Sequence, residues 1–149
     1  MESYTHIILS PGPGLPDAAG LLKPIIETYG SRKKILGVCL GLQAIGEVYN
    51  CSLRNLEQVY HGITSDVTIV EPASRLYANI ETTISVGRYH SWVIDEDKMS
   101  NDLLITARDQ NNEIMSIEHR QFAVYGVQYH PESIMTPKGK TIVENFLRL

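Results

Sequence analysis

The 149-residue sequence lacks the features that mark membrane, secreted and nucleic-acid-binding proteins. No apolar stretch approaches the roughly 20 residues needed to cross a bilayer. The first residues, Met1-Glu2-Ser3-Tyr4, lack the basic start of a signal peptide. The longest basic run is Arg32-Lys33-Lys34, within 13 basic and 17 acidic residues and a formal net charge of -4. These absences argue against membrane and nucleic-acid partners and predict a cytoplasmic protein.

Cysteine is also scarce, with only Cys39 and Cys51 in the chain. Two cysteines do not make a disulfide scaffold, and in a reducing compartment both are expected as free thiols. The paired C-x-x-C and H-x-x-x-H spacings that hold zinc are absent, so neither a metal site nor a cofactor is predicted. Without repeats, linkers or low-complexity segments, residues 1–149 are expected to form a single domain around one core.

The first half of the chain predicts an alternation of strands and helices. An apolar run at His6–Leu9 is stopped by the turn Ser10-Pro11-Gly12-Pro13-Gly14. A helix is expected from Asp17 to Tyr29, kinked or restarted at Pro24 and stopped at Gly30. The residues Lys34-Ile35-Leu36-Gly37-Val38 predict a buried strand, and Leu42, Ile45 and Tyr49 lie on one face of the helix that follows.

The second half predicts short β segments separated by polar turns. The last two of these segments are expected to pair as a hairpin. Thr136-Pro137 is a good N-cap and first-turn pair for a final helix with one apolar stripe. The predicted architecture is α/β, with an antiparallel β insertion in the second half. The expected strands are Val67 to Val70, Thr83 to Val86, Leu103 to Ala107, Ile114 to Ile117 and Val124 to Tyr129, and the helical stripe comprises Ile142, Val143, Phe146 and Leu147.

Cys39 lies where the predicted strand turns into a helix, within Gly37-Val38-Cys39-Leu40-Gly41-Leu42-Gln43. Glycines two residues before and after a nucleophile are typical of the nucleophile elbow, a strained turn on which flanking side chains would collide. The N-terminus of the following helix favours a thiolate and is expected to lower the thiol pKa. Taken alone, the pattern also fits a small buried cysteine on a turn.

A cysteine that attacks an amide needs a base, and the base needs a group to orient it. Among five histidines, His130 stands out because it ends an apolar strand and is followed by Pro131 and Glu132. The proline fixes the local path, so that Glu132 can reach one imidazole nitrogen while the other faces the thiol. His130 alone also fits a structural strand-end histidine, but together with the Cys39 motif it predicts a Cys-His-Glu triad.

Four ordered motifs together resemble the class I (triad-type) glutamine amidotransferases. The resemblance runs over essentially the whole chain and is closest to the small subunit of anthranilate synthase and its counterpart in aminodeoxychorismate (para-aminobenzoate) synthesis. It implies a flavodoxin-like fold with a mixed central sheet and flanking helices. The motifs are Ser10-Pro11-Gly12-Pro13-Gly14, Gly37-Val38-Cys39-Leu40-Gly41-Leu42-Gln43, Tyr89-His90-Ser91-Trp92 and Gly126-Val127-Gln128-Tyr129-His130-Pro131-Glu132-Ser133.

The resemblance implies a role for each site residue. Cys39 would form a γ-glutamyl thioester, with His130 and Glu132 completing the triad. The oxyanion hole would use the Leu40 amide and one from the Pro-Gly loop, for which Gly14 is preferred to Gly12. Two of these residues also have a structural alternative: Gln43 could be an exposed helix residue, and Trp92 could be a core aromatic. The implied substrate-binding residues are Gly12, Pro13, Gly14, Gln43, Ser91 and Trp92.

Two features depart from the family pattern. Leu42 stands where the family usually has histidine, a change expected to affect packing more than chemistry. Family members also begin with a strand, a helix and a second strand before the Pro-Gly loop, whereas this chain reaches the loop within ten residues, so an N-terminal truncation is expected.

His61 resembles a family turn near the substrate but is assigned a structural role, and His6, His90 and His119 are expected to be core or surface residues.

The implied activity is hydrolysis of L-glutamine to glutamate and ammonia. Because ammonia must be channelled to be useful, a chorismate-using synthase subunit (component I) is the expected protein partner, most simply that of anthranilate synthase. The aminodeoxychorismate pathway is the first alternative. A non-catalytic glutamine-binding or regulatory fragment is the second, and a stand-alone hydrolase of γ-glutamyl bonds is the third.

Overall fold

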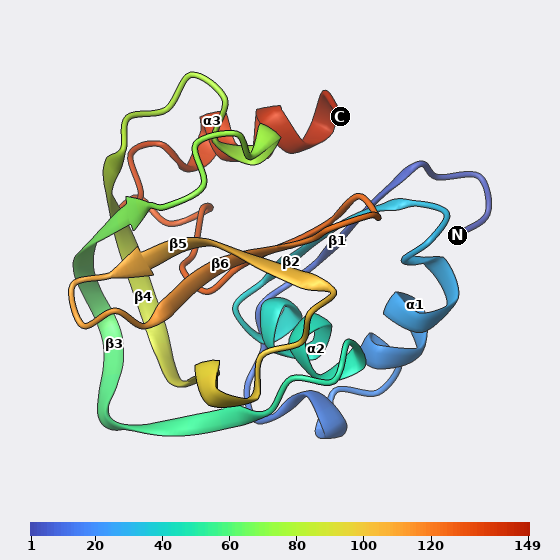
Figure 1. The fold of residues 1–149 in the computed structure, drawn as a ribbon, viewed down its shortest axis with the longest axis horizontal. Helices are drawn as coiled ribbons and strands as arrows, with labels where there is room; N and C mark the ends of the chain where they lie inside the picture. The colour runs from blue at the N-terminus through green and yellow to red at the C-terminus, as the bar shows by residue number, and fades with distance from the viewer.

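The computed structural model describes all 149 residues and contains one seven-stranded sheet in the order β1-β2-β7-β6-β5-β3-β4 (Figure 1). Strands β1 (His6–Leu9), β2 (Lys34–Val38) and β7 (Val124–Val127) are parallel. The other four are joined by antiparallel pairing, and β6 joins them to β7. They are β3 (Leu53–Ile69), β4 (Thr83–Ile94), β5 (Leu103–Asp109) and β6 (Ile114–His119). The mixed sheet and the predicted β6-β7 hairpin are thus confirmed.

Helices cover both faces of the parallel strands. Helices α1 (Leu22–Tyr29) and α2 (Leu40–Val48) lie on one side, and α3 (Gly139–Leu147) lies at the other (Figure 1). Alternating residues of β2 show why: Ile35 belongs to the core cluster with α1 and α2, whereas Leu36 belongs to the cluster with α3. A strand buried on both faces needs apolar residues without alternation, as its sequence has.

Three local expectations are wrong. The predicted helix from Asp17 to Tyr29 is divided before Pro24, because Gly20 adopts a positive φ of 59° and α1 begins only at Leu22. Pro24 then lies in the first helical turn, where proline is tolerated. The second correction is that Thr136 does not cap α3, which begins at Gly139 after Lys138.

The third correction concerns the antiparallel strands, which are longer than the short segments predicted. Strands β3 and β4 form a long ribbon. Most of β3 is exposed and its polar residues do not alternate strictly with apolar ones, so its hydropathy marks only the end that carries the buried Val67 and Ile69. In the final helix, Ile142 and Phe146 are fully buried but Leu147 is 52% exposed, so the predicted stripe is narrower than expected.

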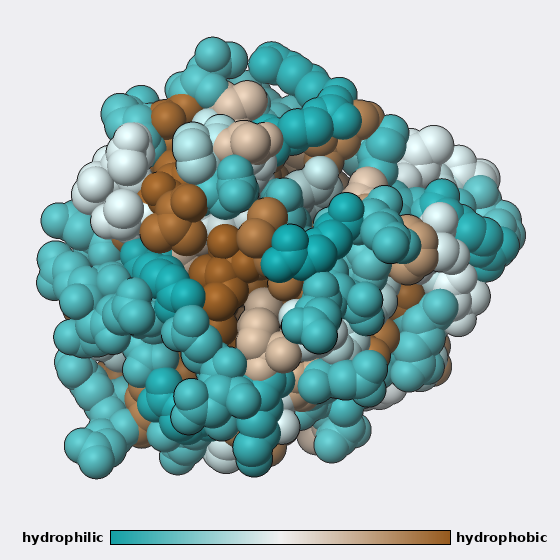
Figure 2. Space-filling model, viewed as in Figure 1, coloured by the Kyte–Doolittle hydropathy of each residue, from teal (hydrophilic) through white to brown (hydrophobic).

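The surface is predominantly hydrophilic in the view of Figure 2, with apolar atoms gathered in a hollow near its centre. No helix combines the length and the apolar character that crossing a membrane requires. Cys39 and Cys51 are both free thiols, as expected, and they belong to different core clusters.

Candidate active site

Cys39 occupies a strained turn between β2 and α2. Its φ is 53° and its ψ is -100°, a conformation that side-chain-bearing residues rarely adopt. A Cβ on Gly37 would lie 2.5 Å from the backbone of Gly41, and a Cβ on Gly41 would lie 2.6 Å from the carbonyl oxygen of Leu9. Only glycine therefore fits at the two flanking positions, because the surrounding backbone leaves no space for a side chain. This steric requirement is the one expected from the sequence.

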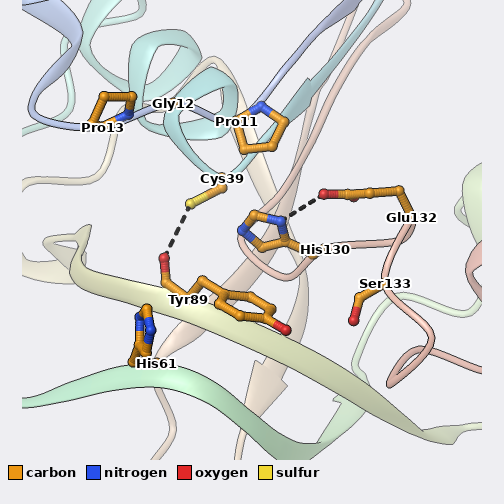
Figure 3. A pocket seen from close by; sticks show the side chains of 9 residues that line it. All are labelled: Pro11, Gly12, Pro13, Cys39, His61, Tyr89, His130, Glu132 and Ser133. Atoms are coloured by element: carbon orange, nitrogen blue, oxygen red, sulfur yellow. Dashed lines mark hydrogen bonds and ion pairs between the residues drawn. The ribbon is translucent and has the colours of Figure 1, made fainter.

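Cys39 lies in a cleft of about 670 Å³ that collects residues distant in the sequence. The Pro-Gly loop after β1 forms one wall, and the loop that follows β7 forms another (Figure 3). Tyr89 from β4 and His61 from β3 complete the lining. His61, assigned only a structural role from the sequence, thus lines the cleft, where its ring packs edge-on against Tyr89 at 5.9 Å. The lining residues are Pro11, Gly12, Pro13, Cys39, His61, Tyr89, His130, Glu132 and Ser133.

His130 is oriented by Glu132. The Nδ1 atom of His130 lies 2.6 Å from Oε1 of Glu132, and a carboxylate accepts, so Nδ1 carries the proton. The Nε2 atom is buried and has no hydrogen-bond partner. In Figure 3 the imidazole lies between Glu132 and Cys39. The ring therefore offers an unused basic nitrogen within the cleft.

The main chain of His130 is fixed by β4 and by Thr136. The His130 amide donates to the Gly87 carbonyl at 3.0 Å, and the Thr136 hydroxyl donates to the His130 carbonyl at 2.7 Å. The same hydroxyl accepts from the Gly87 amide at 2.9 Å. Thr136 thus joins the His130 loop to the sheet, a role that its sequence position, typical of a helix cap, concealed.

The Cys39 thiol is not hydrogen-bonded to His130. It donates to the Tyr89 carbonyl at 3.8 Å and accepts from the Gln128 side-chain amide at 3.6 Å. Burial raises the pKa of the Cys39 thiol to about 11, although the Leu40 amide and the Gln128 side chain act in the opposite direction. The expectation of a lowered thiol pKa is wrong for this free site, because loss of hydration, together with the charge of Glu132, outweighs these two hydrogen bonds.

A smaller cavity of about 170 Å³ adjoins Cys39 and contains the residues singled out for substrate binding. Gln43 is not the exposed helix residue that was one alternative, because it is only 3% exposed. Its side-chain amide donates to the Trp92 carbonyl at 3.0 Å and to Gln128 at 3.3 Å. The lining residues are Gly12, Pro13, Gly14, Cys39, Gln43, Tyr89, His90, Ser91 and Trp92.

The two candidate oxyanion donors belong to different elements, α2 and the Pro-Gly loop. Leu40 begins α2, and its amide is close enough to the thiol to favour the thiolate. Gly14 has a φ of 78°, a conformation that favours glycine, and Gly12 packs so closely that a Cβ would lie 3.2 Å from the Leu40 side chain. The Pro-Gly loop therefore lies directly against the elbow.

The sequence reasoning gave no role to Gln128 or Tyr89. Gln128 is fully buried and bridges Gln43 to the Cys39 thiol. Tyr89 contacts both halves of the site, since its carbonyl accepts from the thiol and its ring packs 4.9 Å from that of His130. Both residues lie inside motifs that resemble the family, which was the only sign of a role in the sequence. A motif does not show which of its residues contact one another in the folded protein.

The family model for class-I glutamine amidotransferases matches residues 1–149, the full chain. This chain belongs to that family. It is 43% identical to anthranilate synthase component 2 of Lactococcus lactis over 147 residues, covering 98% of this chain and 74% of that protein. It is 39% identical to aminodeoxychorismate synthase component 2 of Escherichia coli over 141 residues, covering 95% of this chain and 74% of that protein.

The length of the relatives differs from that of this class-I amidotransferase chain. The bifunctional protein TrpGD of Thermotoga maritima is 38% identical over 148 residues, which cover 99% of this chain but only 25% of that protein. A solved glutamine amidotransferase from Thermotoga maritima superposes with a TM-score of 0.73 at 16% identity, covering 99% of this chain and 63% of that one. This likeness supports the fold alone.

Proposed function

We propose that this chain hydrolyses L-glutamine to glutamate and ammonia through a γ-glutamyl thioester on Cys39. The observation that carries the proposal is the meeting, in one cleft, of a cysteine on a strained elbow and a histidine whose Nδ1 is held by Glu132. Because Nε2 of His130 has no partner, it is available to take the thiol proton.

Each step conserves atoms and protons. Nε2 of His130 takes the Cys39 proton as the sulfur attacks the side-chain amide carbon of glutamine. The imidazolium then gives that proton to the leaving nitrogen, and ammonia departs as the carbon-nitrogen bond breaks. Water attacks the thioester with His130 again as base, and the returning proton restores the thiol as glutamate leaves.

The amides of Leu40 and Gly14 are the proposed donors to the oxyanion. The raised pKa of Cys39 favours the neutral thiol in the free site, so the thiol needs His130 as the base that accepts its proton. Glutamine is proposed to lie along the smaller cavity. Its binding residues there are Gly12, Pro13, Gly14, Gln43, Ser91 and Trp92.

We further propose that the ammonia passes to a chorismate-using synthase subunit, and that residues 1–149 act as one glutaminase domain. The names of the component 2 relatives support the first point, and a single sheet with strands from both ends of the chain supports the second. Anthranilate synthase is the first choice of partner. Mixing the chain with either component I, with glutamine as nitrogen source, distinguishes the two pathways by which product forms.

A glutamine-like chloroketone tests the nucleophile without a synthase partner. It should alkylate Cys39 and leave Cys51 untouched, because Cys39 lines the cleft whereas Cys51 packs in the other core cluster beside Met99. Free glutamine should slow the labelling. The matched controls are Cys39→Ala, which should not be labelled, and Cys51→Ala, which should be labelled normally. Equal labelling of both thiols, or no protection by glutamine, contradicts the assignment.

A further inference from the structure

A buried ion pair contacts His90, one of the residues that line the smaller cavity. Nη1 of Arg88 on β4 is 2.8 Å from Oδ2 of Asp109 at the end of β5, and each side chain is only 1% exposed. The Arg88 guanidinium also stacks 3.5 Å from the centre of the Tyr60 ring. Burying two charges costs hydration that their attraction repays poorly unless further hydrogen bonds use them. The other hydrogen bonds of Arg88 therefore indicate the role of the ion pair.

Arg88 fixes the tautomer of His90. Its Nε donates to Nε2 of His90 at 3.1 Å, and guanidinium groups only donate, so Nε2 carries a lone pair. Nδ1 of His90 lies 3.1 Å from the Trp92 carbonyl oxygen, which only accepts, so Nδ1 carries the proton. Burial and then the Arg88 charge lower the pKa of His90 to about 4, which agrees with a neutral ring.

The Trp92 carbonyl thereby receives two hydrogen bonds. One comes from His90, and the other comes from the side-chain amide of Gln43 at 3.0 Å. Gln43 also reaches Gln128, whose amide donates to the Cys39 thiol. A continuous series of contacts thus connects the ion pair to the wall of the cavity and to the nucleophile.

The pairing of β4 with β3 is irregular beside the smaller cavity. Asn55 of β3 pairs with Trp92 and Tyr60 pairs with His90, so residues 56–59 of β3 bulge opposite the single residue Ser91. The regular backbone ladder is interrupted where β4 lines the smaller cavity. Side-chain contacts must supply the positional restraint that the ladder omits.

We propose that Arg88 is a positioning residue for the substrate. Held by Asp109, it keeps His90 as the Nδ1-H tautomer, and His90 in turn fixes the Trp92 carbonyl and the cavity wall formed by Ser91 and Trp92. The substrate's identity as glutamine rests on the proposed function, but the tautomer does not. We call this series of contacts, from Arg88 through His90 to the Trp92 carbonyl, the relay. Loss of the relay should weaken substrate binding and leave the chemistry at Cys39 nearly intact.

The first test replaces the pair without leaving a lone buried charge, using Arg88→Met with Asp109→Asn. Methionine fills space against Tyr60, and asparagine keeps the oxygen that accepts from the amides of Asn111 and Glu113. The KM for glutamine should rise about tenfold, the effect of losing about one positioning hydrogen bond. The kcat should change less than the KM.

The control is Arg54→Met with Glu113→Gln, which removes a more exposed ion pair of 2.6 Å between β3 and the turn after β5. Its KM should equal that of the wild type. Equal changes in KM for the two double variants, both folded, would overturn the inference.

A second pair of variants avoids disturbing the charges. His90→Asn places an amide donor near the position of Nδ1, toward Trp92, whereas His90→Gln places its amide near Nε2, toward Arg88. His90→Gln should therefore raise the KM for glutamine more than His90→Asn does. The reverse order, or no difference, contradicts the relay.

Nitrogen-15 NMR of the histidine rings gives a readout that does not depend on activity. The wild-type His90 should show a protonated Nδ1 and an unprotonated Nε2, and the Arg88→Met/Asp109→Asn protein should show a mixture of tautomers. An Nε2-H tautomer in the wild type overturns the inference even if glutamine is hydrolysed. The correct tautomer in a wild-type protein that fails to bind or hydrolyse glutamine contradicts the proposed function and not the relay.

Discussion

Nδ1 of His130 donates to Oε1 of Glu132 across 2.6 Å, although the two side chains differ sharply in exposure, at 12% and 56%. The carboxylate is therefore accessible from solvent while the ring it orients is largely enclosed. This arrangement leaves the buried Nε2 without a partner and directed to the cleft. The exposed position of Glu132 limits how much its charge adds to the effect of holding the ring.

The first prediction separates the base from its orienting group. His130→Ala should lower kcat for glutamine hydrolysis by about 10² to 10⁴-fold, the usual contribution of a positioned base. Glu132→Gln should cost less than His130→Ala, because the amide oxygen can still accept from Nδ1. Steady-state ammonia release measures both, with Glu27→Gln on the exposed face of α1 as the isosteric control. A Glu132→Gln loss as large as that of His130→Ala contradicts the assigned roles.

The second prediction concerns Thr136, whose hydroxyl joins the carbonyl of His130 to the amide of Gly87. Thr136→Val keeps the shape but leaves the Gly87 amide unpaired and removes one of two donors to the His130 carbonyl, which keeps the Ser133 amide at 3.1 Å. The free energy of unfolding should therefore fall by about 1 to 3 kcal/mol, and kcat should also fall. Urea unfolding measures the stability. Thr83→Val, at an exposed threonine of β4, is the control and should change neither quantity. Wild-type kcat in Thr136→Val would remove this residue from the account of the site.

The third prediction tests the steric cause of the elbow. Gly37→Ala would put a Cβ 2.5 Å from the Gly41 backbone, so it should cost about 3 kcal/mol or more and displace Cys39. Gly20→Ala also suffers from a positive φ but meets nothing within 4 Å, so it should cost only about 1 to 2 kcal/mol. Thermal unfolding compares the two proteins. Similar losses of stability in the two variants would show that the steric contact at the elbow does not cause the destabilisation by Gly37→Ala.

The fourth prediction follows from the neutral His90. Its pKa is lowered from 6.5 to about 4, first by burial and then by Arg88. Between these pH values the unfolded chain binds a proton that the folded protein excludes, so stability present above pH 6.5 is lost as pH falls toward 4. The contribution is up to about 3 kcal/mol.

His90→Asn provides the comparison, because it removes this titration while His6 and His119, whose pKa values are also lowered, remain. The free energy of unfolding should therefore fall less steeply with acid in the variant than in the wild type. Parallel acid profiles for the two proteins would mean that His90 is not held neutral by the fold.

The sequence predicted the parts of this structure that depend on local chemistry. Strands His6–Leu9 and Lys34–Val38 have the predicted bounds, since apolar runs ended by turn residues leave little freedom. The elbow at Cys39 was predictable because only glycine fits at the two flanking positions. The contact between His130 and Glu132 was predictable because one proline separates them.

The remaining features depend on contacts between distant segments. Thr136 has the sequence context of a helix cap, but its hydroxyl is engaged by a strand nearly fifty residues away. The raised pKa of Cys39 could not be foreseen, because the burial that causes it includes packing with residues distant in the sequence, such as Val86 and Val127 of the same core cluster. The same holds for His90, which looked like a core residue and whose neighbours Arg88 and Asp109 are brought together only by the sheet.

The central claim is that glutamine is hydrolysed through an acyl group on Cys39, and trapping that group tests it most directly. The chain is mixed with L-glutamine, quenched in acid during turnover and digested for mass spectrometry, alongside Cys39→Ala. The account predicts a glutamyl adduct on the Cys39 peptide that neutral hydroxylamine removes, no adduct on the Cys51 peptide, and no ammonia from Cys39→Ala. Release of ammonia by Cys39→Ala at the wild-type rate, or an adduct on another residue, would contradict it.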